Sequence, residues 1–245
     1  MTFARLSVLW ALVLAVAGCA TGPTADPRDP LEPFNRSVYE FNESLDSALV
    51  KPVAQGYHAV LPSPVRQGVS NFFGNLGDLW SGVSGVLQGE GGAALDSFAR
   101  FGINSTVGLL GLFDVAGAMD IERHSLDFGQ TLGRWGLPTG PYLVLPLLGP
   151  TTVRDTVALP VDWKGDVVTH VSDIPARNQA TALRLVDKRA SLLQASSLLE
   201  EAALDRYTFV RDVVLQRRGG VKDTGDDGGD DAASAPAPVT KPTTP

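Results

Sequence analysis

The spacing of apolar side chains along the chain predicts a mainly helical protein. In the first part of the sequence, apolar residues recur every three or four positions, as they do on one side of an α-helix. Pro52 follows this stripe. Because proline lacks the amide hydrogen that a helix interior requires, we expect the first helix to end there. The stripe consists of Phe34, Val38, Phe41, Leu45 and Leu49.

A second helix is predicted at 67–88, beginning past Pro64. One side of it is apolar, whereas the other is built from Gly, Ser and Asn, with Asp78 as its only charge. An ordinary surface helix would carry Lys and Glu on that side. Small residues permit either close helix packing or contact with a membrane interface, and the pattern leaves both open. The small and polar set is Ser70, Asn71, Gly74, Asn75, Gly77, Ser81, Gly82, Ser84 and Gly85.

Further helices are predicted on either side of a central apolar region. One spans about 91–101. Two charged amphipathic helices are predicted within 174–218, with a break near Ser196 and Ser197. Their mixed charged and apolar sides are typical of helices that pack on a protein core.

Two segments between these helices combine apolar side chains with Gly and Pro. Residues 136–153 contain no charged residue, and four prolines exclude a regular helix. Residues 102–118 are Gly-rich, and Asp114 is their only charge. Connecting segments are normally polar, because they run over the surface. Two interpretations remain open: a buried loop or short hairpin in the core, or a surface that contacts acyl chains.

The first nineteen residues have the features of an export signal and a lipidation site. Arg5 precedes an apolar stretch at 6–17, which is too short to span a bilayer as a mature helix. The sequence VAGC at 16–19 resembles the bacterial lipobox, and Cys19 is the only cysteine. We expect cleavage before Cys19 and lipid on its thiol; the alternative is a plain secretory cut beside an incidental cysteine. Ala20, where an Asp would favour the inner membrane, favours the outer membrane.

These features divide the chain into four parts. They are a signal peptide at 1–18, a lipidated tether at 19–28, a helical domain at 29–218 and a tail at 219–245. The tail is acidic and rich in Gly and Pro, without apolar periodicity. We therefore expect it to be disordered.

The overall charge is acidic, with 20 Lys and Arg against 27 Asp and Glu and a formal net charge of −7. Binding to nucleic acid requires clustered positive charge, so a nucleic-acid partner is not expected. Bulk attraction to anionic lipid headgroups is disfavoured for the same reason. The hydrophobic fraction of 44% includes the polar tail, so the rest of the chain is more apolar than this average.

The sequence carries no signature of catalysis or of metal binding. His58, His124 and His170 lie far apart, and none is part of a metal-ligand motif, so we expect no metal site. No G-x-S-x-G nucleophile motif occurs. The sequence therefore disfavours an enzyme, and we expect no cofactor.

Several distinctive segments follow one another in a specific order. They are DPLEPFNR at 29–36, KPVA at 51–54, NFF at 71–73, LQG at 87–89, NSTVG at 104–108, FGQTLG at 128–133 and GPY at 140–142. Together they resemble the VacJ-like (MlaA) family of outer-membrane lipoproteins. The resemblance runs from about residue 29 to residue 215.

The resemblance implies a mainly α fold. A ring- or disc-like helical body with apolar Gly/Pro-rich loops would lie in the inner leaflet of the outer membrane, around a central channel. Phospholipid, a trimeric outer-membrane porin and a periplasmic lipid-carrier protein are the implied partners. Such a protein removes phospholipids misplaced in the outer leaflet, passes them to the carrier and maintains lipid asymmetry. It would be anchored by lipid on the periplasmic side of the outer membrane.

Carried onto this sequence, the resemblance gives two sets of candidate residues. The apolar side of the second helix would face acyl chains or a neighbour, through Phe72, Phe73, Leu76 and Trp80. A flexible Gly-rich hairpin would lie near the channel and gate lipid passage. The candidate channel or gate residues are Gly108, Leu109, Leu110, Gly111, Leu112, Phe113 and Tyr142. Asp114, Arg154 and Asp155 are expected to be structural, pairing with each other or with loop backbone.

Two other functions remain open. A non-transporting structural lipoprotein would support the porin or envelope assembly without touching lipid. A lipid-modifying enzyme is the second, and the missing nucleophile motif counts against it.

Overall fold

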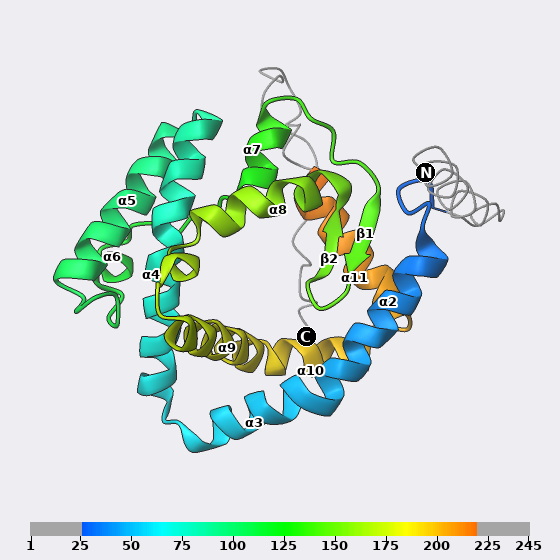
Figure 1. Ribbon diagram of the computed structural model, residues 1–245, viewed down its shortest axis with the longest axis horizontal. Helices are drawn as coiled ribbons and strands as arrows, with labels where there is room; N and C mark the ends of the chain where they lie inside the picture. The colour runs from blue at the N-terminus through cyan, green and yellow to red at the C-terminus, as the bar shows by residue number, and fades with distance from the viewer. Residues whose placement is uncertain (1–25, 220–245) are drawn as a thin grey trace, which may run out of the picture.

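The computed structural model describes residues 26–219, which form a mostly helical ring (Figure 1). The elements are α2 (Glu32–Leu45), the π-helical turn η1 (Asp46–Val50), α3 (Lys51–Val60), α4 (Ser63–Gln88), α5 (Gly91–Thr106), α6 (Val115–Ala118), α7 (Phe128–Arg134), β1 (Tyr142–Leu145), β2 (Gly149–Thr152), α8 (Val153–Gly165), the 3₁₀ helix η2 (Val167–His170), α9 (Ile174–Ser191), α10 (Leu193–Ala202) and α11 (Arg206–Gly219). The mainly α, ring-like fold is confirmed. The predicted signal peptide, Cys19, most of the tether and nearly all of the tail lie outside the described residues.

The ring is closed by elements that are distant in the sequence. Helices α2 and α3 form one arc, α4 forms the next, and α8, the β1–β2 hairpin and α11 complete the circuit (Figure 1). Helices α9 and α10 run along the inner side of the first arc (Figure 1). Within residues 26–219, no helix is both long enough and apolar enough to cross a bilayer.

The prediction that Pro52 ends the first helix is wrong. The chain remains helical from Glu32 to Val60, because η1 joins α2 directly to α3. Pro52 lies in the first turn of α3, where a missing amide hydrogen is tolerated. The wider hydrogen-bonding pattern of the π-helical turn allows the chain to pass the proline with a change of direction.

Helices α4 and α5 pack closely through small residues. A Cβ atom on Gly85 would lie 3.0 Å from the backbone nitrogen of Ala94, and one on Gly82 would lie 2.7 Å from the ring of Phe98. Gly89 ends α4 with a left-handed φ of 74°. Gly82 and Gly85, two of the small residues predicted on this helix, therefore serve close helix packing.

The charge-free segment 136–153 contains the β1–β2 hairpin. Its strands are antiparallel, with Tyr142 opposite Thr152. Tyr142 and Val144 are fully buried and pack with residues of α11. Asn35 of α2 fixes β1 by donating to the carbonyl of Tyr142 (3.1 Å) and accepting from the amide of Val144 (2.9 Å). The base of this segment is therefore a core hairpin.

Helices α7 and α8 were not predicted from the sequence. Each begins with a side-chain cap: Asp127 accepts from the amide of Gln130, and Thr152 accepts from the amide of Asp155. Helix α7 has only seven residues and α8 contains Pro160, so neither shows a clear helical period. The capping residues Asp127 and Thr152 were the sequence signal from which these helices could have been predicted.

The C-terminal region contains three helices where two were predicted. The breaks lie at Leu192 and in the short link after α10, not at Ser196 and Ser197. Both serines lie inside α10, where their hydroxyls donate to the carbonyls of Leu193 and Gln194. Serine can satisfy its hydroxyl within a helix in this way, so it marked no boundary here.

Candidate functional site

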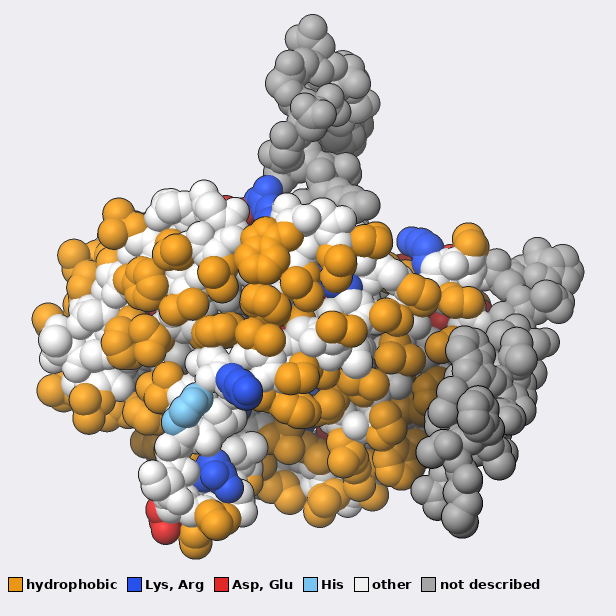
Figure 2. Space-filling view, turned by 45° about the horizontal axis from the view of Figure 1, so that its top comes forward, with side chains coloured by type: hydrophobic (Ala, Val, Ile, Leu, Met, Phe, Trp, Pro, Cys, Tyr) orange, Lys and Arg blue, Asp and Glu red, His pale blue; other side chains and the backbone are white. Residues whose placement is uncertain are grey.

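Many of the buried side chains among the described residues are polar, and many of the exposed ones are apolar. Arg100, Asn35, Asn75 and Asn104 are among the largest fully buried side chains. In α4, polar and small residues are buried, whereas Val86 is 61% exposed. Hydrophobic side chains cover much of the visible face in Figure 2, with few charges between them. An apolar surface of this extent marks contact with lipid or with another protein.

A loop at 107–113 is the most exposed apolar segment near α4. It joins α5 to α6, on the outer side of α4 (Figure 1). Leu109 and Leu110 are 61% and 71% exposed, with φ angles of 51° and 60°. A left-handed conformation costs a non-glycine residue on the order of 1–3 kcal/mol. The surrounding contacts therefore hold two leucines outward in a strained backbone.

Hydrogen bonds and close packing hold this loop in place. The amide of Gly111 donates to the carbonyl of Asn104 (2.7 Å), and Asn71 donates to the carbonyl of Leu112 (3.1 Å). A Cβ atom on Gly108 would lie 2.6 Å from the Asn104 carbonyl oxygen. One on Gly111, whose φ is 89°, would lie 2.6 Å from Asn75. These contacts hold the loop, which was expected to be flexible. Both glycines are required because neighbouring atoms lie too close for a Cβ atom.

A buried charge cluster anchors the end of the loop. Arg100 donates to both carboxylate oxygens of Asp114 (2.6 and 2.8 Å) and lies 3.5 Å from Asp78. Arg123 lies 3.1 Å from the carboxylate of Asp78. Burial raises the pKa of Asp78, against the two arginines. Burial opposes ionisation of Asp114 too, but hydrogen bonds led by Arg100 lower its pKa below the usual value.

The contacts of Arg154 and Asp155 also agree with the structural role expected for them. Arg154 and Asp155 pair at 3.0 Å, and Arg218 lies 3.2 Å from Asp155. Asp114 pairs with Arg100 and caps α6, so it is not a partner of Arg154. Each of these charges has an opposite charge beside it, as burial requires.

The structure does not bring Tyr142 to the other candidate gate residues. Tyr142 is fully buried in the hairpin core and packs edge-on against Tyr207, with ring centroids 6.0 Å apart. The hairpin and the loop at 107–113 lie on opposite sides of the ring (Figure 1). Burial raises the pKa of the Tyr142 phenol. Tyr142 is thus placed to support the hairpin.

The four residues expected to face the membrane are all half-buried. Phe72 and Phe73 pack edge-to-face with centroids 5.3 Å apart. The indole of Trp80 donates to Asp162 of α8 at 2.8 Å, so Trp80 faces a neighbouring helix. Leu76 is partly covered as well. The most exposed large hydrophobic residue of α4 is instead Val86.

The tip of the hairpin is an exposed apolar site that sequence reasoning did not single out. Leu147 and Leu148 are 71% and 57% exposed, and Leu147 has a φ of 66°. Trp135 and Leu137, just before the hairpin, are 60% and 46% exposed. The absence of charge in 136–153 was the available signal. The base of the segment is therefore a buried hairpin, and contact of its exposed apolar tip with acyl chains stays a prediction.

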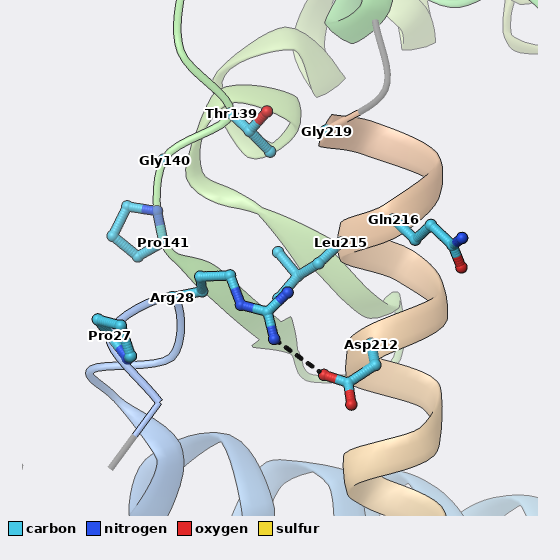
Figure 3. A pocket seen from close by; sticks show the side chains of 9 residues that line it. All are labelled: Pro27, Arg28, Thr139, Gly140, Pro141, Asp212, Leu215, Gln216 and Gly219. Carbon is cyan, nitrogen blue, oxygen red and sulfur yellow. Dashed lines mark hydrogen bonds and ion pairs between the residues drawn. The ribbon is translucent and has the colours of Figure 1, made fainter. Parts of the chain in front are cut away.

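A cleft of about 820 Å³ lies between residues 27–28, the 139–141 loop and α11 (Figure 3). Arg28 points across it toward Asp212, at 3.4 Å (Figure 3). Pro27, Pro141 and Leu215 give much of the remaining lining an apolar character. The chain enters the ring beside this cleft, eight residues after the predicted lipidation site.

Comparisons with known proteins match most of the chain. The family model described as MlaA lipoprotein matches residues 27–220. The intermembrane phospholipid transport system lipoproteins MlaA of Escherichia coli (strain K12) and Shigella flexneri are each 36% identical over 219 residues, covering 87% of this chain and 86% of the relative. The protein of the same name from Haemophilus influenzae is 32% identical, covering 86% of this chain and 88% of the relative.

A solved structure gives a similar result. It was described under "Structural basis for maintenance of bacterial outer membrane lipid asymmetry". It is 34% identical and superimposes with a TM-score of 0.69, covering 79% of this chain and 98% of that chain. The likeness therefore extends from sequence to fold.

Proposed function

Because the chain belongs to the MlaA lipoprotein family, we propose that it removes phospholipids misplaced in the outer leaflet of the outer membrane and maintains lipid asymmetry. Relatives are named for intermembrane phospholipid transport, and the similar solved structure concerns outer-membrane lipid asymmetry. The family is one of phospholipid-transport lipoproteins, which agrees with a non-enzymatic role.

The observation that supports this function best is the inverted burial of the described residues. A water-soluble protein of this size would bury its large aliphatic side chains. Here Leu109, Leu110, Leu147 and Leu148 are exposed, while Arg100 is buried. Lipid is a solvent in which that arrangement is stable, because apolar side chains need no cover there.

The lipid anchor would hold the ring in the inner leaflet, on the periplasmic side. Cys19 would carry the acyl chains, and several chains on one residue anchor far more firmly than one. The described chain begins only a few residues later, beside the cleft at Arg28. The body would therefore lie at the membrane surface from which it takes lipid.

The loop at 107–113 and the hairpin tip would contact acyl chains from opposite sides of the ring. The gate role remains our proposal for the loop from Gly108 to Phe113. Tyr142 has no part in this gate, since it is buried in the hairpin core on the opposite side of the ring. A trimeric porin would cover part of the exposed apolar surface, and a periplasmic carrier would accept the lipid.

A transfer assay tests the function. The full lipoprotein in donor vesicles, with an acceptor carrier, should move labelled phospholipid that mass analysis finds chemically unchanged. Phospholipid should also co-purify with the protein in stoichiometric amount. Protein without lipid and without transfer would favour a structural lipoprotein, and altered lipid would show an enzyme.

A further inference from the structure

A polar pocket of about 470 Å³ lies at a corner of the ring, away from the cleft of Figure 3. It is formed by α3, the start of α4 and the junction of α9 and α10, which meet at this corner (Figure 1). Hydroxyl, amide and guanidinium groups line it, including those of Ser63, Arg66, Gln67, Ser191, Gln194 and Ser197. Such a lining contrasts with the apolar surface around most of the ring.

Arg66 is a charged group of this pocket that has no carboxylate partner among residues 26–219. Its Nε atom is buried and has no hydrogen-bond partner among the described residues. By contrast, Arg100 and Arg189 both pair with carboxylates at 2.6–2.7 Å. A buried donor without a partner is uncommon and requires an explanation. A guanidinium facing a pocket is well suited to bind phosphate.

The start of α4 adds positive potential at the same place. Ser63, the first residue of this 26-residue helix, lines the pocket. No side chain caps this end of α4, and its first turn holds no acidic residue. Pro64 has no amide hydrogen, and the amides of Val65 and Arg66 already donate to the carbonyl of Pro62 (3.0 and 3.2 Å), so the contribution of this helix end is its dipole, whose positive end attracts anions.

One carboxylate also lines the pocket, and its oxygens are already engaged. Asp187 accepts from the phenol of Tyr57 (2.8 Å) and from the hydroxyl of Ser70 (2.7 Å). Burial and this hydrogen bond raise the pKa of Tyr57 to about 12, so the phenol keeps its proton at neutral pH. His58 is the other titratable group in the lining. Arg66 is thus not neutralised by a direct ion pair with Asp187.

The surroundings of the pocket fit an amphiphilic ligand. Val65, which precedes Arg66, and Val60, two positions after His58, are 49% and 78% exposed. We propose that this pocket binds the phosphate group of a phospholipid, with Arg66 as the charged contact and the acyl chains over the two valines. This inference rests on the proposed function and adds a headgroup site to it. Free inorganic phosphate carries the same phosphate oxygens, so the test compares its binding with that of the phospholipid.

The test measures binding of dihexanoylphosphatidylglycerol to the full lipoprotein in detergent, by calorimetry. Arg66→Gln should weaken binding about tenfold, since it removes a charge-assisted hydrogen-bond donor. Arg66→Lys should weaken it less. The matched control Arg177→Gln removes the same charge from α9 outside the pocket and should leave binding unchanged. Unfolding temperatures show whether each variant is folded, and Gln194→Ala, predicted to weaken binding several-fold, replaces Arg66→Gln if that variant does not fold.

Two results would overturn the proposal. One is equal affinity of the wild type, Arg66→Gln and Gln194→Ala for the lipid. The other is inorganic phosphate binding as tightly as the lipid, which would make the pocket an anion site without lipid recognition. Either result, with normal lipid transfer by the wild type, leaves the proposed function standing. Loss of transfer in the wild type itself would refute that function instead.

Discussion

Arg100 and Asp114 form an ion pair at 2.6 Å that ties the apolar loop at 107–113 to α5. The Arg100 side chain is only 2% exposed, whereas that of Asp114 is 30% exposed. The carboxylate also accepts from Asn104 (2.9 Å) and caps α6 through the amide of Gly117 (3.0 Å). One side chain thus joins the buried charge cluster to the loop that exposes its leucines.

Removing the Asp114 carboxylate should destabilise the protein strongly. Asp114→Ala leaves Arg100 buried with Asp78 as its remaining carboxylate, at 3.5 Å. Breaking a buried pair costs about 3–5 kcal/mol, and the partial exposure of Asp114 places the expected loss near the lower end. Thermal unfolding in detergent measures it. The exposed partner of Lys51 provides the control: Glu200→Gln should leave the unfolding temperature nearly unchanged, and an equal effect of both changes would contradict the account.

Gly108→Ala should disrupt the loop, whereas Gly102→Ala should not. The new methyl group at 108 would lie 2.6 Å from the carbonyl oxygen of Asn104, but nothing lies within 4 Å of the equivalent position at 102. Gly102 is inside α5, so alanine there should stabilise by about 0.5–1 kcal/mol. Unfolding temperatures of the two variants test this. A Gly108→Ala protein as stable as the wild type would show that the loop does not need its tight form.

Replacing the strained leucines should separate folding from function. The double change Leu109→Asn and Leu110→Asn keeps left-handed backbone accessible, because asparagine tolerates it better than leucine. We expect unchanged or slightly raised stability in detergent, with phospholipid transfer reduced severalfold. A matched change away from the exposed loop, Leu185→Asn on α9, should leave transfer unaffected. Full transfer by the double variant would exclude acyl-chain contact by these leucines.

Acid should weaken the junction where the chain enters the ring. Hydrogen bonds from Arg28 lower the pKa of Asp26 from 3.8 to about 2 in the folded state. The unfolded chain therefore binds more protons between these pH values. The stability from this carboxylate is complete above pH 3.8 and is lost as the pH falls through about 2.

The measurement is the difference in unfolding temperature between wild type and Asp26→Asn. Burial raises the pKa values of Asp78 and Asp162, which act in the opposite direction, but they are common to both proteins. The wild-type advantage should be present at pH 7 and shrink at pH 3. An advantage that grows on acidification would contradict the assignment.

The sequence predicted helices where the apolar period was long and uninterrupted, and missed those without such a period. The stripe from Phe34 to Leu49 and the small residues of α4 were readable, since both repeat along one side of a helix. Helix α7 is too short for a period, and Pro160 interrupts α8. The continuation past Pro52 depends on a π-helical turn, which has no clear sequence signal.

The candidate site was predictable only in part. An apolar Gly-rich loop could be recognised from composition, but the strain at Leu109 and Leu110 could not. The pairing of Arg100 with Asp114 joins residues on different elements, and the pocket around Arg66 joins four helices. Tyr142 was grouped with the loop by resemblance alone, and the fold places it in the hairpin core. Each of these features depends on tertiary contacts, which the sequence pattern does not show.

Surface-exposed phospholipid on cells that lack this gene tests the central claim most directly, with and without a plasmid copy. The account predicts that outer-leaflet phospholipid rises in the deletion strain, that the wild-type copy reverses the rise, and that a copy with Leu109→Asn and Leu110→Asn reverses it only partly. Wild-type levels of outer-leaflet phospholipid in the deletion strain, together with other envelope defects, would contradict the account and favour a structural lipoprotein.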